Sequence, residues 1–66
     1  MNSNNPEVSI IMSVYNGEHF VTDAINSILN QTFRNFEFLI FNDGSKDGSL
    51  KKIKKFKDKR IKLYSF

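Results

Sequence analysis

The sequence predicts an α/β fold in which three parallel strands alternate with two helices, in the order β-α-β-α-β. Apolar runs at 8–14, 36–41 and 61–66 each have the length of a strand, and turn-forming residues follow the first two. The segments between these runs carry apolar residues at the helical period. Strands that alternate with helices form parallel sheets with right-handed crossovers. We therefore expect half of a doubly wound, Rossmann-like sheet with strand order 3-2-1.

The first half of the chain supplies one strand and one helix. Residues 8–14 alternate between two faces of the first strand, and a turn follows it. The helix is expected to begin near Glu18, with Asn16 as its N-cap, and to end at Asn30. Its apolar stripe consists of Phe20, Val21, Ala24, Ile25, Ile28 and Leu29.

The second strand, over 36–41, is expected to be buried on both faces, as the central strand of a parallel sheet is. It stops at four turn-forming residues, Asn42, Asp43, Gly44 and Ser45. Ligands of open α/β sheets bind at the carboxyl ends of the strands. Asp43 is therefore the first candidate for a functional residue.

A second helix and an edge strand complete the predicted order. Ser45 or Asp47 is expected to cap the helix, whose apolar residues are Leu50, Ile53 and Phe56. The strand over 61–66 carries Lys62, which favours a place at the edge of the sheet.

Length and composition limit the class of protein. A chain of 66 residues forms at most one small domain, and a domain of this size buries only about 60% of its unfolded surface. With no cysteine, a disulfide and a thiolate metal site are excluded, and a reducing compartment is favoured. No apolar run approaches the roughly 18 residues that cross a bilayer. We expect residues 1–7 to be a disordered polar leader and residues 8–66 to be the domain.

Charge is distributed unevenly along the chain. Through Ser45 there is one arginine against five acidic residues, and from Lys46 there are nine basic residues against two acidic ones, so the net charges are −4 and +7. The stretch between Lys51 and Lys62 could be a small basic module that binds nucleic acid or an anionic membrane. The interpretation that we favour is the solvated face of a helix, because the apolar residues among the lysines follow core spacing.

Several linked motifs resemble family 2 glycosyltransferases. The resemblance runs from residue 8 to about residue 66 and implies the incomplete N-terminal part of a GT-A type nucleotide-sugar-binding domain. The matching segments are 8–16, 24–33, 36–45 with 47–49, and 60–62.

The resemblance implies a UDP-type donor whose nucleoside contacts Ser13, Tyr15 and Asp43. The Tyr15 ring can stack on the base, an interaction that contributes about 1–3 kcal/mol in nucleic-acid complexes. The Asp43 carboxylate can accept a hydrogen bond from a uracil N–H or a ribose hydroxyl. Val14, with Ser13, can offer backbone groups. The family commonly has an acid where this chain has Asn42.

The resemblance also implies what these residues lack. In the family, a later Asp-x-Asp-like motif holds a divalent cation, Mn²⁺ or Mg²⁺, and a later carboxylate deprotonates the acceptor hydroxyl. No acidic cluster follows Asp58. We therefore expect neither catalytic nor metal-binding residues here, and no sugar transfer by this chain alone.

The implied partners are the nucleotide sugar and, for the full enzyme, a saccharide or lipid-linked acceptor used in polysaccharide biosynthesis. We expect no nucleic acid. We expect a cytoplasmic location, with membrane association of the full-length protein, and self-association through an exposed sheet edge.

Overall fold

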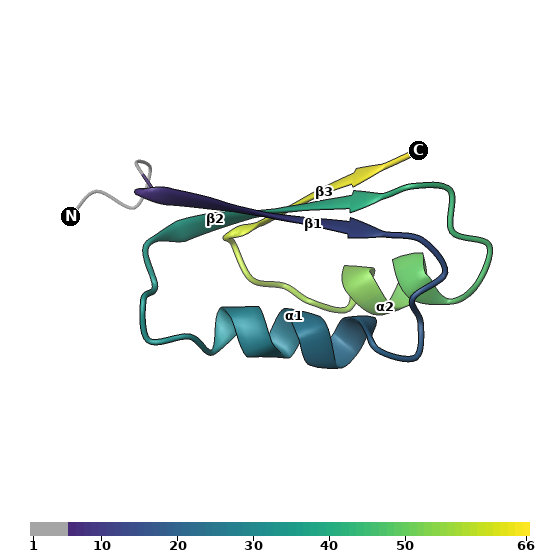
Figure 1. Ribbon diagram of the computed structural model, residues 1–66, viewed down its shortest axis with the longest axis horizontal. Helices are drawn as coiled ribbons and strands as arrows, with labels where there is room; N and C mark the ends of the chain where they lie inside the picture. Colours follow the sequence, from purple (N-terminus) through teal and green to yellow (C-terminus); the bar gives the residue numbers. More distant parts are fainter. Residues whose placement is uncertain (1–5) are drawn as a thin grey trace.

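Three strands and two helices alternate along the chain in the computed structural model, which describes residues 6–66 (Figure 1). The predicted β-α-β-α-β order is therefore confirmed. The elements are β1 (Val8–Val14), α1 (Val21–Leu29), β2 (Phe36–Asn42), α2 (Ser49–Lys54) and β3 (Ile61–Ser65).

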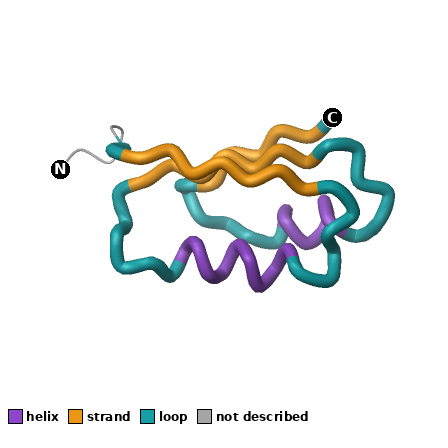
Figure 2. The backbone as a smooth tube through the Cα atoms, viewed as in Figure 1, coloured by secondary structure: helices purple, strands orange, loops and turns teal. Residues whose placement is uncertain are grey.

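The strands form one parallel sheet in the order β1-β2-β3, which is the predicted 3-2-1 order read from the other edge. Val8 pairs with Phe36 at one end of β1, and Val14 pairs with Asn42 at the other. Both helices lie on the same side of the sheet (Figures 1 and 2), which leaves a helix-covered face and a helix-free face. β1 and β3 are the two edges, as expected for β3.

The core lies between the sheet and the helices. Phe38 and Ile40 of β2 and Ile25 of α1 are fully buried, and burial of each such side chain contributes about 1.5–3 kcal/mol. The buried apolar residues are Val14, Val21, Ile25, Phe36, Phe38, Ile40 and Ile53.

Burial along β2 alternates instead of covering both faces. Phe38 and Ile40 are buried, whereas Leu39 and Phe41 on the other face are partly exposed. The prediction that both faces are buried is wrong, because both helices cover the same face. On the helix-free face the Phe41 ring stacks on that of Tyr64, with 5.2 Å between centroids.

α1 begins later than the sequence predicted, at Val21 instead of near Glu18. Asn16 is not its N-cap: the Gly17 carbonyl accepts the N–H groups of Phe20 and Val21, at 3.1 and 2.9 Å. Phe20 is 60% exposed and so lies outside the buried stripe. A Cβ on Gly17 would stand 2.8 Å from the Phe20 ring, so a larger residue here would displace that exposed ring.

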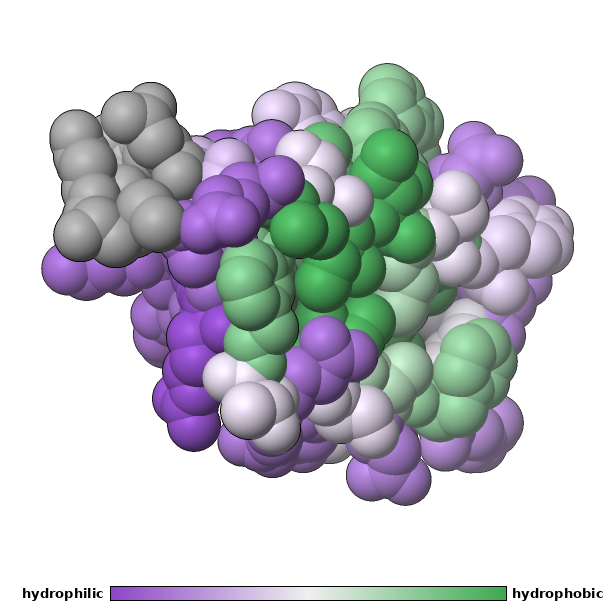
Figure 3. Space-filling model, turned by 60° about the vertical axis from the view of Figure 1, so that its left-hand side comes forward, coloured by the Kyte–Doolittle hydropathy of each residue, from purple (hydrophilic) through white to green (hydrophobic). Residues whose placement is uncertain are grey.

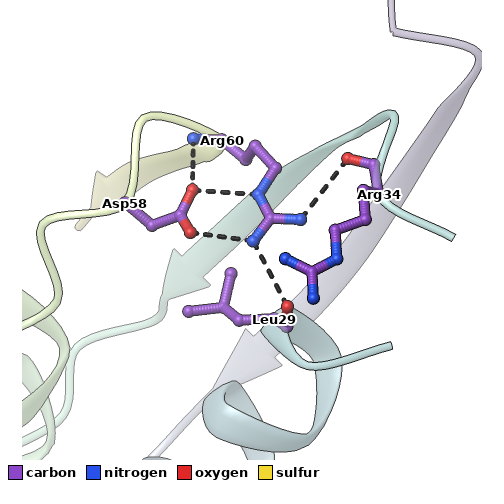
Figure 4. A network of polar contacts seen from close by, with 4 residues as sticks. All are labelled: Leu29, Arg34, Asp58 and Arg60. Carbon is purple, nitrogen blue, oxygen red and sulfur yellow. Dashed lines mark hydrogen bonds and ion pairs between the residues drawn. The ribbon is translucent and has the colours of Figure 1, made fainter. Parts of the chain in front are cut away.

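An arginine joins four segments at the amino ends of β2 and β3 (Figure 4). The Arg60 guanidinium donates to both carboxylate oxygens of Asp58, at 3.0 and 2.8 Å, and to the carbonyls of Leu29 and Arg34, at 3.3 and 3.4 Å. It also lies 4.5 Å from the centroid of the Phe36 ring. Its hydrogen bonds hold the pKa of Asp58 below the ordinary value. This network fixes the end of the sheet opposite to the predicted site.

The predicted leader falls mainly outside the described residues, because residues 1–5 are not among them. From residue 7 onward the chain is attached to the fold, since the Glu7 N–H donates to the Asn35 carbonyl at 3.2 Å. Neither helix between residues 6 and 66 has the length and apolarity that a membrane span requires.

Candidate functional site

β1 and β2 end side by side at the carboxyl edge of the sheet. Val14 and Asn42 are register partners, and the N–H of Asp43 donates to the Val14 carbonyl at 2.9 Å. Tyr15 and Asp43 therefore leave adjacent strand ends, as the sequence predicted. Both are exposed, Tyr15 by 63%. An aromatic ring and a carboxylate are thus available to a ligand from neighbouring strands.

The other two predicted residues occupy the last positions of β1. Ser13 is exposed on the helix-free face, where its register partner is Phe41. The Val14 side chain is buried, and its carbonyl accepts the Asp43 N–H. Val14 therefore joins the two strand ends through its backbone, whereas Ser13 presents its side chain to solvent.

The loops that follow β1 and β2 are bound to each other, which the sequence did not reveal. The Asn16 N–H donates to Ser45 Oγ at 2.9 Å, and Asn16 Oδ1 accepts the Lys46 N–H at 2.8 Å. Asn16 has φ +50°, a left-handed conformation that asparagine tolerates better than most residues. The two loops are therefore joined directly beside Tyr15.

A buried serine continues this contact between the loops. Ser49 is completely buried; its Oγ accepts the Gly17 N–H at 2.8 Å and donates to Asp47 Oδ1 at 2.6 Å. Asp47 also accepts the N–H groups of Ser49 and Glu18, at 2.9 and 3.2 Å. The Ser49 hydroxyl and these N–H groups hold the pKa of Asp47 below its ordinary value.

Glu18 binds the second loop instead of starting a helix. Its carboxylate accepts the Gly48 N–H at 3.2 Å, and its carbonyl accepts a hydrogen bond from Lys52 Nζ at 2.6 Å. We call Asn16, Glu18, Ser45, Asp47 and Ser49 the loop clamp.

The cap of α2 differs from the prediction. Gly48 occupies the N-cap position, so the expectation of Ser45 or Asp47 there is wrong. Both side chains serve the loop clamp, although Asp47 still accepts the Ser49 N–H at the start of the helix. The signal in the sequence was the pair of turn motifs, Asn-Gly and Asp-Gly-Ser, after successive strands. Which residue of one loop bonds to which residue of the other depends on the packing.

The turn around Asp43 has two special residues. Gly44 has φ +70°, a conformation that side-chain-bearing residues rarely adopt. Asn42 is 2% exposed, and its amide nitrogen donates to Ser65 Oγ of β3 at 3.1 Å. Asn42 therefore belongs to the buried face of β2, whereas Asp43 is exposed.

Among residues 6–66, no three histidine, cysteine, aspartate or glutamate side chains come together in a way that could hold a metal ion. The described residues therefore do not fit a divalent-cation site.

Comparison with known proteins gives consistent matches. The family model described as Glycosyl transferase family 2 matches residues 9–66. An uncharacterized glycosyltransferase of Haemophilus influenzae is 44% identical over 64 residues, which cover 94% of this chain and 20% of the relative. The putative glycosyltransferase EpsE of Bacillus subtilis is 42% identical over 66 residues, covering 96% of this chain and 23% of that protein.

A relative from Escherichia coli has a more specific name, UDP-Glc:alpha-D-GlcNAc-diphosphoundecaprenol beta-1,3-glucosyltransferase WfgD. It is 48% identical over 56 residues, which cover 85% of this chain and 22% of the relative. The chain thus spans roughly a fifth of the length of these three relatives.

Proposed function

We propose, because the chain belongs to glycosyltransferase family 2, that it forms the donor-nucleotide-binding part of an enzyme that transfers a sugar to an acceptor hydroxyl. The chain spans about a fifth of its relatives, so the complete reaction is a property of the longer protein. The observation that carries the proposal is the exposure of Tyr15 and Asp43 at adjacent strand ends joined by the Asp43–Val14 hydrogen bond.

The chemistry of these two residues suits a uridine nucleoside. The Tyr15 ring stacks on the flat base, and the Asp43 carboxylate, which only accepts hydrogen bonds, selects the N3–H of uracil or a ribose hydroxyl. Ser13, exposed on the strand that leads to Tyr15, adds a hydroxyl and its backbone to the nucleoside contacts, and Val14 adds its backbone.

The loop clamp prepares this site before the ligand arrives. Its hydrogen bonds fix both loops, and ordering them beforehand reduces the entropy lost when a ligand binds. We infer that the clamp positions Tyr15 relative to Asp43 and touches no part of the donor.

A UDP-sugar is the donor class that we propose, with support from the name of the Escherichia coli relative. That name also specifies a lipid-linked acceptor for the relative, and we propose a lipid-linked or saccharide acceptor in polysaccharide biosynthesis for the longer protein here. We propose that this sugar transfer takes place in the cytoplasm, at a membrane surface.

We infer that these 66 residues do not transfer sugar on their own. The described residues offer no set of metal ligands, and the general base of the reaction must lie within hydrogen-bonding reach of the acceptor hydroxyl. Both groups are expected from parts of the longer protein. Metal-dependent hydrolysis of a UDP-sugar by the purified chain would contradict this inference.

We also propose that the isolated chain self-associates. In the sheet formed by residues 6–66, β1 and β3 each have no strand partner on one side, and open strand edges pair readily with other chains. Hydrophobic surface gathers in a continuous patch on one face of the molecule (Figure 3). A second copy of the chain would cover both the open strand edges and the hydrophobic patch.

Titration of the chain with UDP, followed by amide NMR and calorimetry, tests the donor proposal. Asp43→Asn replaces a charge-assisted hydrogen bond with a neutral one, a difference of about 1–1.5 kcal/mol, so it should weaken binding roughly 5- to 10-fold. Asp23→Asn is the matched control, because Asp23 is an exposed acid of α1 and its loss changes the net charge equally. The control should bind UDP as the unmodified chain does.

Methylation of the ligand gives an independent readout. N3-methyl-UDP lacks one of the two donors that Asp43 could serve, so binding as weak as that of UDP to Asp43→Asn would assign the carboxylate to the uracil N3–H, and unchanged binding would assign it to a ribose hydroxyl. If Asp43→Asn and Asp23→Asn bound UDP with equal affinity, and UDP caused no chemical-shift change near Tyr15, the proposed site would be refuted.

A further inference from the structure

A cluster of lysines on the outer surface of α2 and the loop after it takes no part in the proposed donor site. Five of them are exposed: Lys51, Lys54, Lys55, Lys57 and Lys59. We call these five the basic patch. We propose that the basic patch binds the anionic headgroups of a phospholipid membrane.

Three lysines of the basic patch lie on one side of α2. Ser49 and Ile53 are the buried residues of α2, so the outward side lies opposite to them. At about 100° per residue, Lys51, Lys54 and Lys55 fall within an arc of about 100° centred on that outward side. Both helices lie on the same face of the sheet (Figure 1), so this side of α2 is an outer surface of the protein.

The charges of the basic patch are available to a partner. Within residues 6–66, the recorded ion pair joins Arg60 to Asp58, the acid nearest to the patch in sequence, and none of the five lysines takes part in an ion pair. Lysines in the last turn of a helix also stabilise its dipole, which accounts for Lys51 and Lys54. Lys57 and Lys59 lie beyond the helix, so the dipole does not explain them.

The composition of the patch favours lipid over nucleic acid. Single-stranded nucleic acids bind to exposed aromatic rings beside cations, but the one aromatic residue among these lysines, Phe56, is partly buried against the core. Adenine edges are read by asparagine or glutamine, and all five residues are lysines, so the patch could make specific base contacts with guanine at most. To bind a partner, a group of lysines requires only that the partner present a dense layer of negative charge, as anionic lipids do.

The rest of the chain would orient the protein on such a surface. Residues through Ser45 carry a net charge of −4 and those from Lys46 carry +7. The excess positive charge therefore lies in the part of the chain that contains α2, and it favours approach of that part to an anionic membrane. This inference depends on charge and exposure alone and holds whether or not Tyr15 and Asp43 bind a nucleotide.

Sedimentation of the chain with lipid vesicles tests the proposal. The chain should bind vesicles containing about 30% phosphatidylglycerol and not vesicles of phosphatidylcholine alone. Binding should fall steeply between about 0.05 and 0.3 M salt, because exposed charges are screened.

Three variants locate the binding surface. Each lysine near an anionic surface is expected to change partitioning about fivefold, so Lys51→Gln/Lys54→Gln/Lys55→Gln should reduce binding at least tenfold. The matched control, Arg34→Gln/Lys46→Gln/Lys62→Gln, loses the same charge from exposed residues outside the patch and should lose less than threefold. The variant with arginine at the three patch positions should bind as the unmodified chain does, which separates charge from folding.

Three results would overturn the proposal: no preference for anionic vesicles, equal losses in the patch and control variants, or tighter binding to a DNA oligonucleotide than to vesicles at equal phosphate concentration. A parallel UDP titration of the patch variant should give unchanged affinity, so failure of the donor site and failure of the patch are told apart.

Discussion

Replacement of Ser49 by alanine should loosen the loops that carry the candidate site. The Ser49 hydroxyl is completely buried, accepts the Gly17 N–H and donates to Asp47. Alanine leaves the buried Gly17 N–H without an acceptor, which costs about 1–3 kcal/mol. For a domain of this size, each kcal/mol lowers the melting temperature by roughly 4–8 °C. The pKa of Asp47 should also rise toward its ordinary value, because its largest stabilising hydrogen bond is lost.

Thermal unfolding measures the first effect, and NMR titration of the Asp47 carboxyl carbon measures the second. Ser27→Ala is the matched control, since Ser27 is exposed on α1 and should change stability by less than about 0.5 kcal/mol. The donor affinity of Ser49→Ala should fall as well, because the loops are no longer fixed before binding. Unchanged stability together with an unchanged pKa of Asp47 would refute the loop clamp.

Three further predictions follow from the structure. Arg60→Ala should lower the free energy of unfolding by about 1–2 kcal/mol in urea titration, because the hydrogen bonds to two backbone carbonyls and the contact with the Phe36 ring are lost. The partly exposed ion pair with Asp58 adds little to this loss. Arg60→Lys, which lacks the planar guanidinium, should restore less than half of the lost stability. The pKa values of Asp47 and Asp58 are lowered in the fold, so their contribution to stability is complete above about pH 4 and is lost as the pH falls through the lowered values. The urea midpoint should therefore decrease on acidification and decrease less in Asp58→Asn, and an equal decrease in both proteins would argue against this source. Sedimentation velocity over a concentration series should show dimers or larger species, and a single monomer at the highest concentration would contradict self-association.

The order and pairing of the elements could be predicted because they depend on local patterns and chirality. Apolar runs separated by helical periods identify the strands, and right-handed crossovers fix their order. The position of Asp43 at the carboxyl edge follows from the same topology. These features require no knowledge of which side chain meets which.

The errors arose where tertiary contacts decided the local structure. Glu18 has the sequence character of a first helical turn, but its carboxylate accepts from Gly48, the N-cap of α2, and its carbonyl accepts from Lys52 of α2, so α1 begins only at Val21. The apolar character of Leu39 suggested burial on both faces of β2, but the side of the sheet that the helices cover is a property of the whole fold. Neither outcome is encoded within a short window of sequence.

The central claim is that Tyr15 and Asp43 together bind a uridine nucleoside, and intermolecular NOEs test it most directly. In a sample of the chain with UDP, the uracil H5 and H6 protons should show NOEs to the ring protons of Tyr15, while the Asp43 amide shifts in the same titration. The account would be contradicted if the uracil protons showed NOEs only to residues away from the ends of β1 and β2 and none to the Tyr15 ring.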